Sequence, residues 1–184
     1  MWLQGGPGSS SMFGLFEING PFSAVYTEDG SSTTAKPNPN SWSTVANVLY
    51  VDNPIGTGFS HTTDDFALNQ DDVGDDLYEF LIQWFTVFEE YKENDFFAFG
   101  ESYAGNAKEG TIFCRMPCLR IDVLGKYVPT ISKKIHDENQ SADFKINFKG
   151  LGIGNGAIDP YNSFEFGEYL YQVNEISTRG LHVD

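Results

Sequence analysis

The chain has 184 residues, 40% of them hydrophobic and 15% aromatic, and a formal net charge of −15. A domain of this length can bury a substantial core, and its aromatic content excludes the composition of a disordered segment. The acidic charge argues against nucleic-acid binding, which needs clustered Lys and Arg. No apolar run approaches the roughly 18 residues of a membrane-spanning helix, so we expect no membrane partner. The first residues carry no secretion signal, and any such signal would have to precede them.

Five predicted elements alternate between strands and helices. Residues 47–52 form a short apolar run before Asn-Pro, which is typical of a buried strand. Residues 71–88 carry apolar side chains at a 3.6-residue spacing and predict a helix. Residues 95–99 predict a second strand, residues 127–135 a second helix and residues 148–153 a third strand. This order predicts an α/β fold, with helices packed on a parallel sheet through right-handed crossovers.

Other segments are predicted to lie outside this sheet. Residues 30–40 are rich in Gly, Ser and Pro and predict a surface loop. Residues 164–171 predict a helix that leaves the sheet. Cys114 and Cys118 have no histidine nearby, so we expect two incidental thiols and no metal site.

The sequence GESYAG at residues 100–105 directly follows the second predicted strand. A serine on a sharp strand-to-helix turn between small residues projects its hydroxyl from the carboxyl edge of a sheet as a nucleophile. The alternative for this motif alone is an ordinary glycine-rich turn. Its place after a strand favours Ser102 as the nucleophile of a hydrolase.

Two other glycine-rich segments do not match nucleotide-binding motifs. Residues 2–10 lack the Gly-Lys-Ser/Thr ending of a phosphate-binding loop. A Gly-Gly turn upstream of a nucleophile can instead direct backbone N–H groups at a developing oxyanion. Residues 152–156 end a strand but lack the third glycine of a dinucleotide fingerprint. We therefore expect no cofactor.

Four motifs in a fixed order make the chain resemble a known family. They are QGGPGSS at 4–10, DNPIGTGFS at 52–60, GESYAG at 100–105 and GNG at 154–156. Together they resemble the serine carboxypeptidases, especially the vitellogenic-like members, which have Gln before Gly-Gly-Pro-Gly. The resemblance implies a partial α/β-hydrolase fold, with the core over residues 1–159 and the start of a helical cap over residues 160–184.

The resemblance also implies roles for single residues. Ser102 would be the nucleophile, and the backbone N–H groups of Gly6 and Tyr103 would form the oxyanion hole. The substrate's free C-terminal carboxylate would be held by Trp2, Gln4, Gly5 and Glu101. A glutamate beside that carboxylate repels it when ionised but donates a hydrogen bond when protonated, which favours hydrolysis in acid. The implied partners are peptides or proteins with a free C-terminus, and the implied location of the full-length parent is secreted or lysosomal (vacuolar).

The sequence departs from the family in the groups that support the nucleophile. The family's catalytic Asp and His come well after the nucleophile, beyond the cap, and His61, His136 and His182 each fit a surface position better. We therefore expect a fragment that lacks turnover. In the segment FEINGP, Glu17 stands one place earlier than the acidic residue of many relatives, which puts the supporting hydrogen bonds to Glu101 in question.

A second departure interrupts the segment after the nucleophile. In the family the turn that carries the nucleophile, called the elbow, continues directly as Gly-Lys-Tyr-Val-Pro. Here residues 106–125 separate Gly105 from Lys126. One hypothesis is an in-frame retained intron of about 60 nucleotides, and the alternative is a genuine loop insertion. In either case we expect the segment to uncouple the following helix from the elbow, so that the helix N-terminus no longer supports the oxyanion.

Three interpretations of the function remain open from the sequence. The parent protein would be an acid-acting serine carboxypeptidase that forms an acyl-enzyme. An acyltransferase of the carboxypeptidase-like group would keep the same nucleophile. The third interpretation is a truncated, non-catalytic or binding-only chain.

Overall fold

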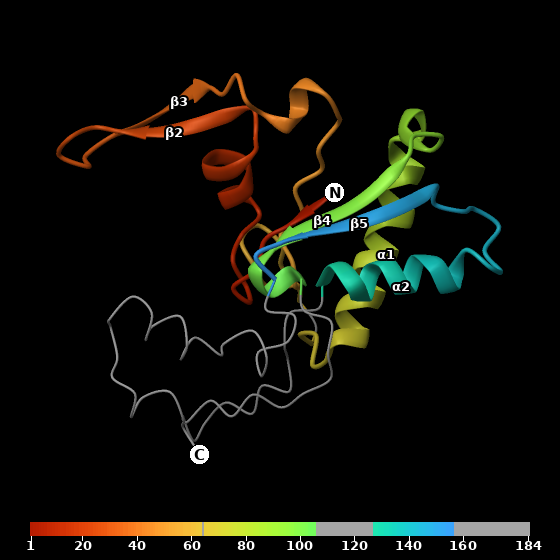
Figure 1. The fold of residues 1–184 in the computed structure, drawn as a ribbon. Helices are drawn as coiled ribbons and strands as arrows, with labels where there is room; N and C mark the ends of the chain where they lie inside the picture. The colour runs from red at the N-terminus through yellow and green to blue at the C-terminus, as the bar shows by residue number, and fades with distance from the viewer. Residues whose placement is uncertain (64, 106–126, 157–184) are drawn as a thin grey trace, which may run out of the picture.

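The computed structural model describes residues 1–63, 65–105 and 127–156, and three parallel strands form its centre (Figure 1). The strands are β1 (Trp2–Leu3), β4 (Phe96–Glu101) and β5 (Phe148–Gly154), in the order β1-β4-β5. Leu3 lies opposite Gly100 in β4, and Gly100 lies opposite Ile153 in β5. The predicted parallel sheet is confirmed, and the second and third predicted strands correspond to β4 and β5.

The predicted strand at residues 47–52 is reduced to a single bridge. Tyr50 pairs with Trp2 in parallel fashion. The Trp2 amide donates to Leu49 O at 2.8 Å, and the Val51 amide donates to Trp2 O at 3.3 Å. The segment lies beside the sheet as predicted, but it forms no longer ladder because β1 itself contains only two residues.

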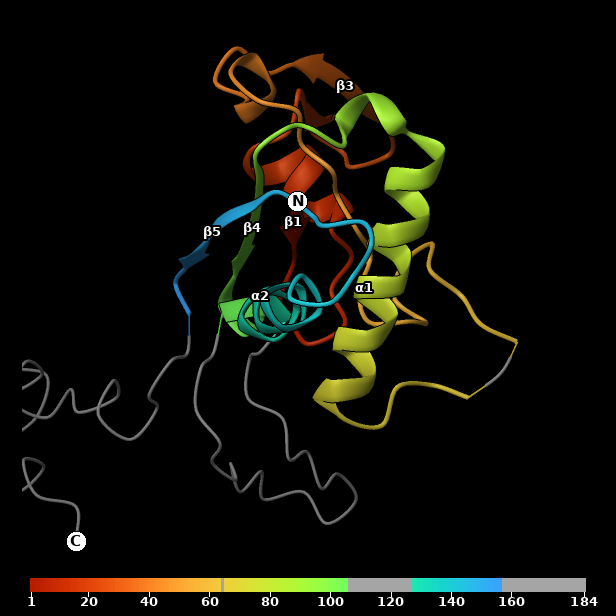
Figure 2. The ribbon, with the colours of Figure 1, turned by 90° about the vertical axis from the view of Figure 1, so that its right-hand side faces the viewer.

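Two helices cover one face of β4 (Figures 1 and 2). Helix α1 (Gln70–Val87) agrees with the predicted 71–88, and α2 (Tyr127–Glu138) contains the predicted 127–135. The Asn69 side chain caps α1 by accepting from the amides of its second and third residues, at 2.8 and 3.0 Å.

The hydrophobic core lies between these helices and the sheet. Alternate residues of β4 face it, because side chains along a strand alternate between the two faces of a sheet. At one end of β4 the ring of Phe96 lies 5.7 Å from that of Phe85 in α1. At the other end Gly100 lies against Val128 in α2. The side chains that are fully buried in this core include Leu3, Leu81, Ala98, Val128, Ile131 and Ile135.

The predicted surface loop at residues 30–40 is wrong in part. Strands β2 (Phe22–Tyr26) and β3 (Thr33–Pro37) form an antiparallel hairpin in which Tyr26 lies opposite Thr33. Figure 1 shows the hairpin extending away from the parallel sheet. All five residues of β3 are exposed, so the strand has no buried face and its sequence carries no apolar alternation.

Several predictions fall outside the described residues: the helix at 164–171, the two cysteines and His182. Within the described ranges, no helix is long and apolar enough to cross a membrane. No group of three or more His, Cys, Asp or Glu side chains in the same ranges is placed to hold a metal ion.

The close approach of β4, β1 and α2 depends on Gly100, which has no side chain. A Cβ there would lie 2.7 Å from the Cβ of Ala104, 2.7 Å from Leu3 O and 2.8 Å from a methyl of Val128. We expect Gly100→Ala to lower the free energy of unfolding by about 1–3 kcal/mol through overpacking.

The matched control for this substitution is Gly150→Ala in β5. Its Cβ would meet the Phe97 ring at 3.7 and 3.8 Å, which is ordinary contact. Alanine also restricts the unfolded chain, so we expect no loss of stability and a gain of up to about 1 kcal/mol. Urea unfolding of both variants measures the difference, and equal midpoints would contradict this account of Gly100.

Candidate active site

Ser102 occupies the turn at the carboxyl end of β4. A single 3₁₀ turn, Ser102–Gly105, follows the strand directly. Ser102 has a φ of 56°, in the left-handed region that non-glycine residues rarely adopt. Its side chain is exposed and has no hydrogen-bond partner among the described residues. The geometry is that of a strained turn which presents a hydroxyl to solvent at the edge of the sheet.

The Gly-Gly segment after β1 lies directly against this turn. A Cβ on Gly5 would lie 2.6 Å from Glu101 O and 2.7 Å from Tyr103 N. Gly6 follows with a φ of +115°, and the Ser9 amide donates to Gly5 O at 3.0 Å to close the turn. Because β1 and β4 are parallel neighbours, their carboxyl ends meet at one edge of the sheet. The structure therefore brings Gly5 to the backbone of the elbow, with Gly6 next along the chain.

Three side chains of the predicted carboxylate site form a hydrogen-bonded series. The Trp2 indole N–H donates to Gln4 Oε1 at 3.1 Å, and Gln4 Nε2 donates to Glu101 Oε2 at 2.9 Å. The indole fixes the orientation of the Gln4 amide, so its N–H₂ must face the carboxylate. Trp2 and Gln4 are buried, whereas Glu101 is half-buried. Glu101 Oε1 has no hydrogen-bond partner within the described ranges, so it remains available to a ligand.

Glu17 takes no part in this series. The hydroxyl of Tyr26 in the β2–β3 hairpin donates to Glu17 Oε1 at 3.2 Å on the exposed surface. The charge of Glu17 and this hydrogen bond raise the pKa of Tyr26. Among the described residues, Gln4 is the side chain that supports Glu101.

Tyr103 packs against the first residue of α2. The rings of Tyr103 and Tyr127 meet edge to face with centroids 5.3 Å apart. The Tyr103 hydroxyl is buried without a hydrogen-bond partner among the described residues. Desolvation, followed by the neighbouring Tyr127, raises the pKa of Tyr103 above its ordinary value. Burial likewise raises the pKa of Tyr127 to about 12, with a hydrogen bond from the backbone of Gly8 acting in the opposite direction.

These contacts correct the expectation that α2 is uncoupled from the elbow. Tyr127 and Val128 are 1% and 0% exposed. Val128 packs against Gly100, two residues before Ser102. The buried side chains of its first turn therefore hold the start of α2 beside Ser102.

The described histidines do not complete the site. His61 and His136 are both exposed, as predicted, and neither forms a hydrogen bond to Ser102. The described residues thus bring together the nucleophile candidate, the Gly5–Gly6 turn and the carboxyl group of Glu101, without a base beside the serine.

Asp52 is a buried residue at the same edge to which the sequence assigned no role. Its carboxylate accepts hydrogen bonds from Ser10 Oγ and Ser11 N, both at 2.7 Å, and from Phe59 N at 2.8 Å. The signal available in the sequence was an aspartate between two glycine-rich loops. Its donors could not be identified from the sequence because two of them lie more than 40 residues away.

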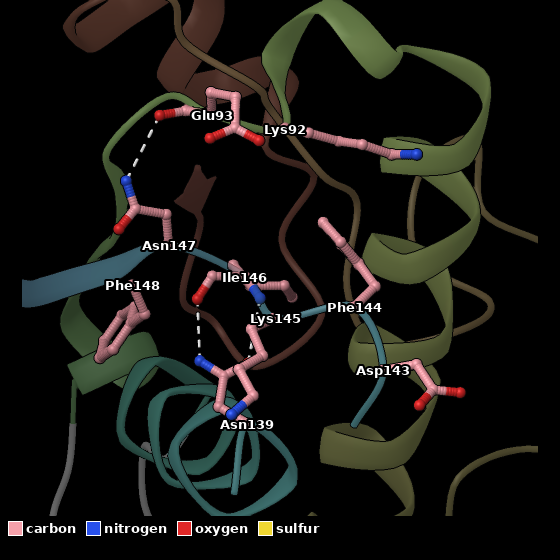
Figure 3. Close-up of a pocket in the computed structure, with 9 residues that line it drawn as sticks. All are labelled: Lys92, Glu93, Asn139, Asp143, Phe144, Lys145, Ile146, Asn147 and Phe148. Carbon is pink, nitrogen blue, oxygen red and sulfur yellow. Dashed lines mark hydrogen bonds between the residues drawn. The ribbon is translucent and has the colours of Figure 1, made fainter. Parts of the chain in front are cut away.

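A separate cavity of about 600 Å³ lies at the opposite end of the sheet, near the amino ends of β4 and β5 (Figure 3). The Asn139 amide there pairs with the backbone of Ile146, donating to its oxygen at 2.8 Å and accepting from its nitrogen at 3.0 Å. Asn147 Nδ2 donates to Asp95 Oδ1 at 3.0 Å. These amide groups stabilise the chain itself, and the cavity lies away from Ser102.

Comparisons with known proteins agree with the motifs. The family model "Serine carboxypeptidase" matches residues 1–107 and 124–182. The venom serine carboxypeptidase of Apis mellifera is 43% identical over 185 aligned residues, which cover 100% of this chain and 34% of the relative. The probable serine carboxypeptidase CPVL of Homo sapiens is 46% identical over 94% of this chain and 32% of the relative. The vitellogenic carboxypeptidase of Aedes aegypti is 38% identical over 98% of this chain and 33% of the relative.

A solved structure supports the same assignment. The prohormone-processing carboxypeptidase KEX1(delta)p of Saccharomyces cerevisiae has a TM-score of 0.75 and 29% identity, over 96% of this chain and 34% of that chain. The chain thus spans about a third of the length of the proteins it matches. It belongs to the serine carboxypeptidase family and has the α/β-hydrolase fold of that family.

Proposed function

We propose that this chain is part of a serine carboxypeptidase that releases C-terminal residues from peptides in acid. The observation that carries the proposal is the hydrogen bond from Gln4 to Glu101, one residue before the strained and exposed Ser102. It fixes the carboxyl group of the residue before the proposed nucleophile, and the other oxygen of this group has no partner among the described residues. This arrangement suits a substrate whose own carboxylate lies close to the bond to be cleaved.

The proposed reaction begins at Ser102. Its Oγ attacks the carbonyl carbon of the last peptide bond, and the carbonyl oxygen becomes an oxyanion that accepts hydrogen bonds from the backbone amides of Gly6 and Tyr103. Collapse of this intermediate expels the C-terminal amino acid and leaves an acyl-enzyme, which water then hydrolyses. The proton transfers need a base and an orienting acid. We infer that the remainder of the full-length protein supplies them.

The proposed carboxylate site consists of Trp2, Gln4, Gly5 and Glu101. The Gln4 amide N–H is already directed at Glu101, and a protonated Glu101 then donates its own hydrogen to the substrate carboxylate. When Glu101 is ionised, the two carboxylates repel each other. This alternation explains a preference for acid, and it fits peptides or proteins with a free C-terminus as substrates. We propose a secreted or lysosomal location for the parent protein, in line with a relative described as a venom protein.

We also infer that residues 106–125 are an insertion relative to the family, encoded by a retained intron. The break in the family match, which stops at residue 107 and resumes at residue 124, supports an insertion here, and a retained intron and a genuine loop insertion would both produce it. Transcripts should therefore include a spliced form that joins Gly105 to Lys126. Sequencing of complementary DNA across this junction checks the prediction. If every transcript keeps the 60 or so nucleotides, the segment is a genuine loop insertion.

We expect residues 1–184 expressed alone to react poorly with a fluorophosphonate probe, and the full-length protein to be labelled at Ser102. Replacing Ser102 by Ala in the full-length protein should lower labelling at least about a thousandfold, because no other group replaces an activated nucleophile. Ser141→Ala, at an exposed serine, is the control and should label like the unaltered protein. Equal labelling of residues 1–184 and the full-length protein would refute the need for the remaining chain. Turnover of peptides and of acyl donors by the same protein separates a hydrolase from an acyltransferase.

We expect Glu101→Gln to flatten the pH dependence of kcat/KM for peptides. As the pH rises and Glu101 ionises, the unaltered protein should lose substrate affinity, and KM should rise more than kcat falls. Glutamine stays neutral and keeps a hydrogen-bond donor, so the variant should lose at least about half of this pH dependence. Peptide amides, which have no terminal carboxylate, serve as the control substrate and should show little effect of Glu101 on KM. An unchanged pH profile for free peptides would remove Glu101 from carboxylate recognition.

A further inference from the structure

Asp52 is a buried carboxylate shared by three hydrogen-bond donors. Its Oδ1 accepts from Ser10 Oγ and from Ser11 N, both at 2.7 Å, and its Oδ2 accepts from Phe59 N at 2.8 Å. The residue is 8% exposed, and no cation forms an ion pair with it among the described residues. A buried carboxylate without a cation is stable only when such donors replace its lost hydration.

The carboxylate joins two loops at the edge of the sheet. Asp52 and Phe59 belong to the loop formed by residues 52–60, whereas Ser10 and Ser11 end the turn formed by residues 4–11. Gly58 has a φ of +55°, and a Cβ at this position would collide with Asp52 Oδ2. The first loop therefore closes around the carboxylate and directs Oδ1 at the second.

Ser11 connects Asp52 to Gln4 at the start of the turn. Its buried Oγ accepts from Gln4 N at 3.0 Å and donates to Val51 O at 2.5 Å. Ser11, which ends the turn, is thus held directly by residues 51–52. Gln4, the residue before the Gly-Gly pair, is held by them through Ser11. Gly6 lies between these two fixed ends.

The chemistry of the donors requires a carboxylate at position 52. Ser11 N and Phe59 N are backbone amides, which donate and cannot accept. An asparagine could offer its single oxygen to one of them but would present its N–H₂ group to the other. In Asp52→Asn the side-chain N–H₂ group therefore faces a backbone N–H group of one of the two loops, although the side chain keeps its size and shape.

We propose that Asp52 is a positioning residue, which through Ser10 and Ser11 holds the turn that carries the Gly6 amide and the Gln4 side chain. This inference rests on the proposed function, because the Gly6 amide matters to catalysis only if it binds an oxyanion. Through Asp52, the loop formed by residues 52–60 sets the geometry of the proposed oxyanion hole.

The test compares the full-length protein with its Asp52→Asn and Ser60→Ala variants. Ser60 is the matched control, because its hydroxyl donates to the backbone oxygen of Asp52 at 2.8 Å and does not touch the carboxylate. Three quantities are measured: the rate constant for fluorophosphonate labelling, kcat and KM per titrated active site, and amide hydrogen exchange in residues 4–11. In Asp52→Asn we expect the labelling rate constant and kcat to fall about 10- to 100-fold, since small displacements of catalytic groups have effects of this size.

The exchange measurement separates positioning from general destabilisation. Amides of residues 4–11 should exchange at least about tenfold faster in Asp52→Asn, while those of β4 and α2 keep their protection. Ser60→Ala should change each quantity less than about threefold. If the substitution lowers only the fraction of active molecules and leaves the rate per active site unchanged, Asp52 has a structural role and the proposal is overturned. Unchanged exchange in residues 4–11 would also overturn it. If the unaltered full-length protein is not labelled at all, the proposed function fails, and the exchange data alone decide whether Asp52 holds the turn.

Discussion

The contact between Gly5 and the backbone around Ser102 is the constraint on which the site depends. The carbonyl of Glu101 and the amide of Tyr103 leave no room for a side chain at position 5. Two turns that are almost 100 residues apart in sequence can therefore share one small volume. Parallel pairing of β1 with β4 provides the approach, and Gly100 provides it again on the side of α2. Bare backbone at Gly5 brings its turn into direct contact with the amide of Tyr103, the residue after Ser102.

This arrangement holds two residues in conformations or environments that are unfavourable on their own, and contacts with the surrounding structure must maintain them. Ser102 adopts a left-handed backbone conformation, and Glu101 keeps an oxygen without a partner among the described residues. Such features persist only where neighbouring contacts determine them. Here the neighbours are the Trp2–Gln4 hydrogen bond on one side and the buried start of α2 on the other. The proposed carboxylate site is consequently held in place without a ligand, which would lower the cost of ordering on binding.

The sequence predicted most of the parallel sheet and both helices, because their apolar spacing reflects burial in one core. It failed where burial gives no pattern: β3 is exposed along its whole length, and the ladder at residues 47–52 is limited by a two-residue partner. At the site, the order of the motifs predicted the residues near Ser102, and their roles stay predictions. The hydrogen bonds of Asp52 depend on contacts between distant segments, which one-dimensional spacing does not encode. The pairing of Glu17 with Tyr26 spans nine residues and depends on how the β2–β3 hairpin lies against the preceding turn.

The seating of Tyr127 against Tyr103 has a practical consequence for engineering. Helix α2 begins at Tyr127 beside the turn that ends at Gly105, so the two ends of this connection lie close together and the second is anchored by buried side chains. A connection with this property can differ in length without altering the register of the sheet, since loop closure costs grow only slowly with length. The junction after Gly105 is thus a natural point for attaching a reporter peptide or a small domain. Such a fusion would place the reporter next to Ser102, where its signal would follow events at this proposed nucleophile.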